Sequence, residues 1–320
     1  MPQLPLFGSQ LPDLPTTRAI ADRVKTRGLE GLPSAVRRAD DTTYQEVQCR
    51  SALNRVQGMP FRWTLNPYRG CTHGCHYCFA RRYQTQLELG SGDDFSSVIL
   101  VKVNFPAVVR RELSREAWQV RNRDAPELVA FGTATDPYQP IEGHYRLSRQ
   151  TLEALVDHPT PIGLITKGPM VVRDKDLLCE LSRHTKTTVS MSVPSVDEEA
   201  WAKLEPGTAH PLQRLRAVRE LRDAGIDAGV LMAPIVPGIT SHPAKIERTI
   251  KAITDHGANY VGGFVMHLDG GTRDHFMEFL GREFPHLVER YGRLYAGKYA
   301  SITYTERVKT VFGALRSRYG

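Results

Sequence analysis

Short apolar runs alternate with longer amphipathic segments along most of the chain, from residue 61 to residue 267. The apolar runs are typical of buried strands and the amphipathic segments of helices. Strands are predicted at residues 61–66, 98–103, 128–132, 162–166, 188–193, 227–233 and 259–267, and helices at 79–89, 106–116, 147–156, 173–184, 212–224 and 242–256. This alternation indicates βαβ units with parallel strands. The predicted fold class is therefore α/β, a partial (β/α) barrel of about six parallel strands.

The two ends of the chain differ from this alternating region. Residues 1–45 are expected to form an extended lead-in, because prolines that interrupt helices recur there: Pro2, Pro5, Pro12, Pro15 and Pro33. From residue 272 onward the pattern is helical, with helices predicted at 274–284, 285–296 and 303–318. We therefore divide the chain into an N-terminal extension (1–50), a barrel (51–270) and a C-terminal helical cap (271–320).

Polar residues gather where the predicted strands end. A cysteine-rich loop follows the first strand, and other polar segments follow later strands at 132–142, 166–168, 190–192, 233–238 and 267–269. In parallel barrels the functional groups lie at the C-terminal ends of the strands. The sequence thus predicts one site at that face of the barrel.

The composition is that of a globular chain. Its 320 residues, 41% of them hydrophobic, can form one large barrel or two small domains. Apolar runs stay shorter than the ~20 residues that span a bilayer. The first 14 residues lack the basic and apolar regions of a signal peptide. Of five cysteines, Cys49 and Cys179 have no evident disulfide partner, so we expect a reducing, cytoplasmic location without a membrane partner.

The net charge of +7 is unevenly distributed. Between residues 47 and 87 there is no acidic residue but six arginines: Arg50, Arg55, Arg62, Arg69, Arg81 and Arg82. Such a stretch can attract a polyanion such as nucleic acid. Alternatively, the arginines can balance negative charge on nearby thiolates. The sequence leaves both interpretations open.

Three of the cysteines, Cys71, Cys75 and Cys78, follow a CxxxCxxC spacing with Tyr77 directly before the last. Three thiolates on one short loop can converge on one inorganic centre, but they cannot supply the four ligands of a closed zinc or iron–sulfur site. In a [4Fe–4S] cluster one iron would remain open to a small chelating molecule. A zinc knuckle that adds His73 or His76 is the alternative. It is disfavoured because zinc sites usually draw their ligands as two separated pairs.

This motif resembles the signature of radical S-adenosylmethionine (SAM) enzymes. In that superfamily SAM chelates the open iron, and an electron from the cluster splits SAM to give a 5′-deoxyadenosyl radical. Further motifs resemble the spore photoproduct lyase-related branch, and within it a subgroup common in actinobacteria; they lie at 66–71, 133–139, 166–167, 173–174, 205–207 and 233–235. An external electron donor, flavodoxin- or ferredoxin-like, is implied.

The resemblance also implies roles for single residues. Cys71, Cys75 and Cys78 would ligate the cluster, and Tyr77 would lie near the adenine of SAM. A turn that includes Gly132, Thr133, Thr135 and Asp136 would hold the SAM amino group, Lys167 its carboxylate, and Ser190 or Ser192 its ribose or carboxylate. The alternatives are a surface position for Lys167, plain strand-end hydroxyls for the serines, and local turn or helix caps for Asp136 and Glu142.

Two positions depart from the branch. Where spore photoproduct lyase has a hydrogen-donating cysteine, this chain has Thr133, and a hydroxyl is a poor hydrogen-atom donor, so thymine-dimer repair is not expected. Gln84 stands where related chains carry a histidine. We therefore expect a radical SAM enzyme with a [4Fe–4S] cluster and SAM as cofactors, and with nucleic acid as the leading candidate substrate. Modification of a peptide or small metabolite is the alternative, and a non-catalytic zinc or nucleic-acid-binding module is the alternative from another class.

Overall fold

The computed structural model describes residues 14–28, 36–37 and 42–319. Its central feature is a seven-stranded sheet in the order β11-β10-β9-β8-β7-β4-β3. Six neighbouring strands are parallel: β4 (Trp63–Leu65), β7 (Val129–Phe131), β8 (Ile162–Thr166), β9 (Thr187–Ser192), β10 (Asp227–Ile235) and β11 (Val261–Val265). The short β3 (Asn54–Arg55) pairs antiparallel with β4. Among the described strands β11 and β3 are the two edges, so the predicted partial barrel of six parallel strands is confirmed.

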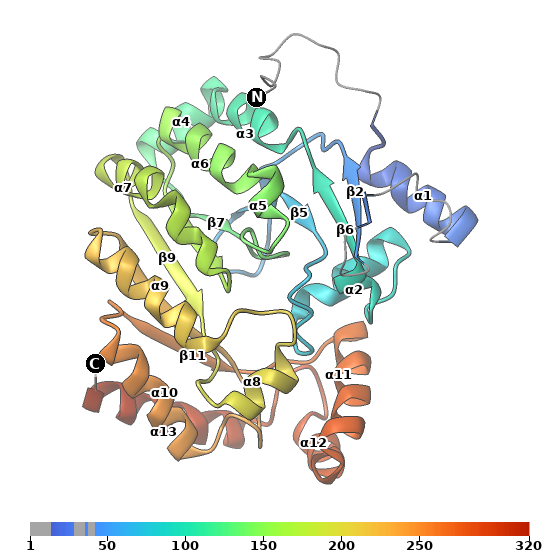
Figure 1. The fold of residues 1–320 in the computed structure, drawn as a ribbon, viewed down its shortest axis with the longest axis vertical. Coiled ribbons are helices and arrows are strands. Elements are labelled where there is room, and N and C mark those ends of the chain that lie inside the picture. Colours follow the sequence, from blue (N-terminus) through green and yellow to red (C-terminus); the bar gives the residue numbers. More distant parts are fainter. Residues whose placement is uncertain (1–13, 29–35, 38–41, 320) are drawn as a thin grey trace.

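The strands of this sheet present one face to a layer of helices. Leu164, Val189 and Val230 are fully buried in the main hydrophobic core on that side. The helical layer follows the strands in chain order (Figure 1) and comprises α3 (Phe105–Leu113), α4 (Glu116–Asp124), α6 (Leu147–Asp157), α7 (Lys175–His184), α9 (Pro211–Asp223) and α10 (Pro243–Asp255). Because side chains alternate along a strand, the residues between the buried ones face the inside of the barrel.

A second sheet, in the order β1-β2-β6-β5, corrects the prediction for residues 98–103. Its strands are β1 (Val36–Arg37), β2 (Thr43–Val47), β6 (Val98–Lys102) and β5 (Tyr68–Arg69). We expected β6 in the barrel, but it pairs with β2 and β5. Both of its faces are covered: Val98 and Leu100 belong to one buried cluster, Ile99 and Val101 to another. An apolar run therefore indicates a buried strand but not the sheet that contains it.

The helix α1 (Thr17–Arg27) contradicts the expectation of an extended lead-in. The Thr16 side chain accepts a hydrogen bond from the Ala19 amide and caps the first turn. Ile20 and Val24, one helical turn apart, are buried with residues of β2 and β6. Pro15 lies just before this helix and so does not interrupt it. The prolines at positions 2, 5, 12 and 33 lie outside the described residues.

The C-terminal helices pack against two different parts of the barrel region. The helix α11 (Gly270–Glu283) packs against η2 (Phe79–Leu87), a 3₁₀ helix where an α-helix was predicted. The predicted helix at 285–296 is a 3₁₀ turn, η4 (Pro285–Leu287), followed by α12 (Val288–Leu294). The last helix, α13 (Ile302–Tyr319), packs against α10 and β11, beside the outer layer of the barrel (Figure 1). The three-part division of the chain stays a prediction.

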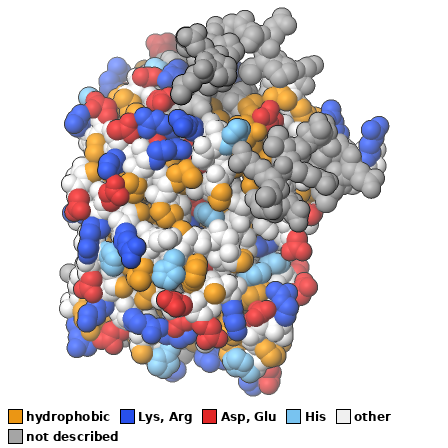
Figure 2. Space-filling model, in the orientation of Figure 1, with side chains coloured by type: hydrophobic (Ala, Val, Ile, Leu, Met, Phe, Trp, Pro, Cys, Tyr) orange, Lys and Arg blue, Asp and Glu red, His pale blue; other side chains and the backbone are white. Residues whose placement is uncertain are grey.

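Charged side chains of both signs share the surface. On the face drawn in Figure 2, lysine and arginine side chains alternate with acidic ones over most of the outline. Among the described residues there is no helix both long enough and apolar enough to span a bilayer.

Candidate functional site

The three motif cysteines lie on one loop, residues 70–78, which we call the cluster loop. It begins directly after β5 at Gly70, whose φ of +82° suits glycine, and where a Cβ atom would lie 2.6 Å from the Val98 carbonyl oxygen. Cys71 and Cys75 are buried and Cys78 is half-buried. The sequence between the cysteines thus folds into a turn that leaves three free thiols close enough to raise one another's pKa.

The thiols affect one another electrostatically. Burial raises the pKa of Cys71, and negative charge on Asp136, Cys75 and Cys78 raises it further. Burial raises the pKa of Cys75 to about 12, although the Lys167 ammonium acts in the opposite direction. A metal centre here must therefore displace protons when it binds. Among the described residues, no group of three or more His, Cys, Asp or Glu side chains is placed to hold a single metal ion.

Arg81 stabilises the cluster loop through hydrogen bonds from its side chain. Its guanidinium is 2% exposed and donates hydrogen bonds to the carbonyl oxygens of Gly74, Cys75, Ser91 and Gly92, at 2.5, 2.9, 3.0 and 2.7 Å. Four of the five N–H donors of this side chain are thus used within the protein. The interpretation of Arg81 as a contact for a polyanion is therefore wrong.

The other side of the cluster loop contacts segments that are distant in sequence. The His76 amide donates to the Leu204 carbonyl oxygen at 3.0 Å, and the Gly207 amide to that of His73 at 3.1 Å. A Cβ atom at Gly207 would lie 2.2 Å from the Thr72 carbonyl oxygen, so this approach requires glycine. On a third side, Nδ1 of His76 lies 2.9 Å from Nε2 of His275 on α11.

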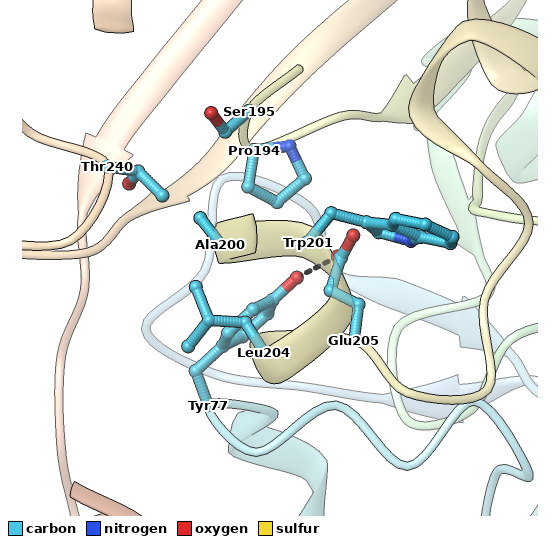
Figure 3. A pocket seen from close by; sticks show the side chains of 8 residues that line it. All are labelled: Tyr77, Pro194, Ser195, Ala200, Trp201, Leu204, Glu205 and Thr240. Atoms are coloured by element: carbon cyan, nitrogen blue, oxygen red, sulfur yellow. Dashed lines mark hydrogen bonds between the residues drawn. The ribbon is translucent and has the colours of Figure 1, made fainter. Parts of the chain in front are cut away.

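Glu205, which follows α8 (Glu198–Leu204), is the centre of a buried charged network. It accepts hydrogen bonds from the Tyr77 hydroxyl and, at 2.6 Å, from the Arg214 guanidinium. Lys167 Nζ lies 3.8 Å from the same carboxylate. Figure 3 shows Tyr77 pointing from the cluster loop toward Glu205, across a small pocket also lined by Trp201, Leu204, Pro194 and Thr240. The sequence predicts no role for Glu205, although it lies in one of the motifs shared with the branch, because it follows a helix and not a strand.

The predicted turn after β7 connects three segments through Asp136. Its carboxylate accepts hydrogen bonds from the Thr166 hydroxyl and, at 2.6 Å, from the Lys167 amide. The same carboxylate lies 3.3 Å from Nδ1 of His73 on the cluster loop. It also accepts from the Tyr138 amide at 2.8 Å, so the turn-cap interpretation of Asp136 describes a contact that is present.

The other residues of this turn face the start of the cluster loop. The Gly132 amide donates to the Leu65 carbonyl oxygen at 3.0 Å. Thr135 donates to the Gly70 carbonyl oxygen at 2.6 Å, and Thr133 lies 3.4 Å from the side-chain amide of Asn66. Glu142 lies farther along and accepts a hydrogen bond from the Ser148 amide in the first turn of α6, as the cap interpretation predicted.

We expect Asp136→Asn to lower the free energy of unfolding of the metal-free protein by about 2 kcal/mol near neutral pH. Burial alone would raise the pKa of this carboxyl, but His73, Thr166 and the Lys167 amide lower it to about 2. A carboxyl whose pKa is lower in the folded than in the unfolded state stabilises the protein fully at pH values above the unfolded-state pKa. This contribution is lost as the pH falls toward the folded-state pKa. Urea denaturation of both proteins should therefore show a difference that shrinks as the pH approaches about 2. If the difference in unfolding free energy stayed constant down to that pH, the ionised Asp136 carboxylate would not be the source of the stability.

Lys167 and Ser192 lie together, whereas Ser190 lies apart. Lys167 Nζ donates to the Ser192 hydroxyl at 2.8 Å. Although burial disfavours its charge, negative charge on Cys75 and Glu205 raises the pKa of Lys167, so it is a cation directed into the site. Ser190 instead pairs with the Tyr260 hydroxyl at 2.8 Å. It lies two residues earlier on β9, about 7 Å farther from the C-terminal face.

Two of the remaining arginines of the 47–87 stretch pair with acidic residues that are distant in sequence. Arg82 lies 2.8 Å from Asp269, and Arg62 lies 3.0 Å from Glu127. Arg69 donates to the Tyr83 carbonyl oxygen and to Gln86. The stretch contains no acidic residue in sequence, but in the structure Asp269, just before α11, and Glu127, just before β7, lie beside its arginines.

Comparison with known proteins adds to these observations. Residues 65–253 match the profile of the radical SAM superfamily. An uncharacterised protein of Mycobacterium tuberculosis is 39% identical over 295 residues, which is 90% of this chain and 85% of that protein. A radical SAM Nα-GlyT isomerase of Pseudomonas phage M6 is 30% identical over 61% of this chain and 37% of its own. A solved spore photoproduct lyase variant with bound SAM and a dinucleoside spore photoproduct has a TM-score of 0.66 and 16% identity over 94% of this chain and 91% of its own.

Proposed function

The chain belongs to the radical SAM superfamily, and from this premise we propose that Cys71, Cys75 and Cys78 hold a [4Fe–4S] cluster at which SAM is cleaved reductively. The superfamily and the spore photoproduct lyase-like fold agree with the sequence prediction. Membership of an enzyme superfamily also sets aside the non-catalytic zinc module. The observation that carries the proposal is a set of three close, free thiols with no fourth cysteine on their loop. Such a set fits a cluster that leaves one iron open.

The chain's own residues would bind and orient the cofactors. The chemistry that the cluster and SAM supply when bound is one-electron cleavage to a 5′-deoxyadenosyl radical. Lys167 offers the cation for the SAM carboxylate, and Glu205 with Ser192 holds that cation at the ends of β8 and β9. The turn from Gly132 to Asp136 offers backbone and side-chain acceptors for an amino group. Tyr77 is fixed by Glu205 beside Cys75, and of the two candidate serines we place Ser192 at the SAM site, because it contacts Lys167 whereas Ser190 pairs with the Tyr260 hydroxyl.

A direct test is anaerobic reconstitution with iron and sulfide, followed by reduction in the presence of SAM. We expect iron–sulfur absorption and formation of 5′-deoxyadenosine, with an external flavodoxin- or ferredoxin-like donor able to replace the chemical reductant. Absence of 5′-deoxyadenosine from a protein that carries its full cluster would overturn the proposal.

For the substrate we propose nucleic acid. Thr133, in place of a thiol, supports a reaction other than thymine-dimer repair.

Lys167→Ala is expected to weaken SAM binding by about 1.5–3 kcal/mol, the usual value of a hydrogen bond between charged groups, which is roughly 10- to 150-fold. Iron content should not change, because Lys167 donates no hydrogen bond to the cluster loop in this structure. Binding is measured by equilibrium dialysis of SAM with reconstituted protein. Lys175→Ala is the matched control, since this lysine also pairs with a glutamate, Glu220, but on the outer layer of helices. If both variants bound SAM with equal affinity, Lys167 would have a purely structural role.

A further inference from the structure

The inner face of the sheet from β9 to β11 has an unusual composition. Beyond Asp227, which begins β10 and accepts a hydrogen bond from the Asn259 side chain at 2.6 Å, its inward-facing residues include seven that are small, apolar or hydroxyl-bearing: Ser190, Gly229, Leu231, Ala233, Tyr260, Gly262 and Phe264. Contacts confirm this orientation. A Cβ atom at Gly229 would touch the Tyr260 ring, and one at Gly262 would lie 3.0 Å from the Leu231 side chain. We call these seven residues the inner wall.

The inner wall is open to solvent. A closed barrel fills its interior with layers of side chains, so inward-facing residues are buried there. Here Ser190, Leu231, Ala233 and Gly262 are only half-buried, and Phe264 on the edge strand β11 is 50% exposed. Phe264 lies opposite Ala233 and Pro234 in the strand register. Its strand, β11, is three strands away from β8, after which Lys167 follows, or roughly 14 Å along the sheet. An exposed aromatic ring inside the barrel is thus within a few strands of the candidate SAM site.

A row of aromatic rings connects the cluster loop to the outside at the same edge. From Phe79, which directly follows Cys78, ring centroids are 6.3 Å apart to Tyr83 and 6.1 Å to His267. His267 lies 6.0 Å from Tyr299, which is 68% exposed. We call these four residues the ring row. His267 follows the end of β11, so the ring row lies at the C-terminal face, above the exposed ring of the inner wall.

Cations border the ring row but not the inner wall. The Arg82 guanidinium lies 5.1 Å from the Tyr83 ring and the Lys298 ammonium 5.4 Å from the Tyr299 ring. Asp269 pairs with both, at 2.8 and 3.4 Å, which leaves one positive charge in excess among these three groups. Burial, together with Lys298 and Arg82, lowers the pKa of His267, so at neutral pH its ring is an uncharged stacking surface.

We propose that this edge of the barrel binds a segment of single-stranded nucleic acid, with one base against the inner wall at Phe264 and neighbouring bases on the ring row. The proposal rests on the nucleic-acid substrate proposed above and deepens it. A base is planar and uncharged, as the inner wall requires, and the charged phosphates stay outside beside Arg82 and Lys298. A free amino acid or a phosphorylated metabolite would instead place its anionic group against a wall whose seven residues include no cation.

Fluorescence anisotropy of reconstituted protein with a labelled single-stranded oligonucleotide of about 12 nucleotides tests the proposal. Phe264→Ala and Tyr299→Ala should each weaken binding at least about fivefold, the lower limit for losing one base–aromatic stack. Tyr299→Phe should retain affinity, because the ring and not the hydroxyl is used. Met59→Ala is the control, since Met59 is also 50% exposed but lies before β4, at the other end of the strands. Arg82→Ala should flatten the salt dependence by about 0.7 per lost phosphate, whereas Arg123→Ala should not.

The outcomes separate this inference from the proposed cofactor chemistry. Reductive SAM cleavage without oligonucleotide binding at low salt would overturn the inference and leave the radical SAM proposal standing. Binding that all variants share equally would also overturn it, because the site would lie elsewhere. Stimulation of SAM cleavage by a peptide but not by any oligonucleotide would replace it with a peptide substrate. Oligonucleotide binding with no SAM cleavage would instead contradict the proposed function. Thermal unfolding of each variant distinguishes lost contacts from lost folding.

Discussion

Replacing Cys75 by alanine is expected to abolish both the iron–sulfur absorption of the reconstituted protein and its cleavage of SAM. The same result is expected for Cys71→Ala and Cys78→Ala, because an iron–sulfur cluster is held by thiolates and these three are the cysteines of the cluster loop. Iron and sulfide analysis, together with assay of 5′-deoxyadenosine, measures both effects. We expect the loss of SAM cleavage to be complete, since no neighbouring cysteine can replace a missing ligand.

Cys179→Ala provides the matched control. Cys179 is half-buried on α7, and its thiol donates to the Ala224 carbonyl oxygen at 3.3 Å, on the outer layer of helices. This variant should keep normal iron content and activity. A Cys75→Ala protein that retains near-normal iron and cleaves SAM would show that the cluster is held elsewhere.

The second large effect is expected for Arg81→Met. This change keeps much of the apolar stem but leaves the carbonyl oxygens of Gly74, Cys75, Ser91 and Gly92 without their buried donor. Hydrogen bonds to a charged group contribute about 1.5–3 kcal/mol each, so the variant should lose at least about 3 kcal/mol of stability. The melting temperature should fall by several degrees, and the cluster should be lost more readily to a chelator.

Arg82→Ala tests the neighbouring position, where the side chain is half-buried and pairs with Asp269. An exposed pair of this kind contributes little to stability, so the melting temperature and cluster retention should stay close to those of the wild type. If the two variants were equally destabilised, the role assigned to the Arg81 hydrogen bonds would be wrong.

The contrast between Arg81 and Arg82 also shows where sequence reasoning stops. Both lie in the same acid-free stretch, and nothing in the sequence distinguishes them. In the structure, η2 turns Arg81 inward to the cluster loop and Arg82 outward to Asp269, 187 residues later. Local sequence gives the charge of a side chain, but only tertiary contacts determine which face of the helix is covered.

The strands were predictable because hydrophobic periodicity reports burial directly. The run at β6 identified a strand but not its sheet, because that depends on β2, a strand that charged and polar neighbours concealed. In the site, Lys167 and Ser192 were predictable from their position at strand ends and do lie together. Glu205 and Arg214 were missed because a buried ion pair between a loop and a helix has no short-range sequence pattern.

The contacts that surround the cluster loop bear on when during synthesis it can take its final form. Tyr77 must wait for Glu205, 128 residues later, and His76 for His275, 199 residues later. At ribosomal rates of about 5–20 residues per second, the second interval lasts roughly 10–40 s. During that time the three cysteines have already been synthesised, but the segments that bury them have not. If the proposed cluster is held here, we therefore expect its insertion to follow completion of the chain, and the nascent chain to carry three accessible thiols that must stay reduced until then.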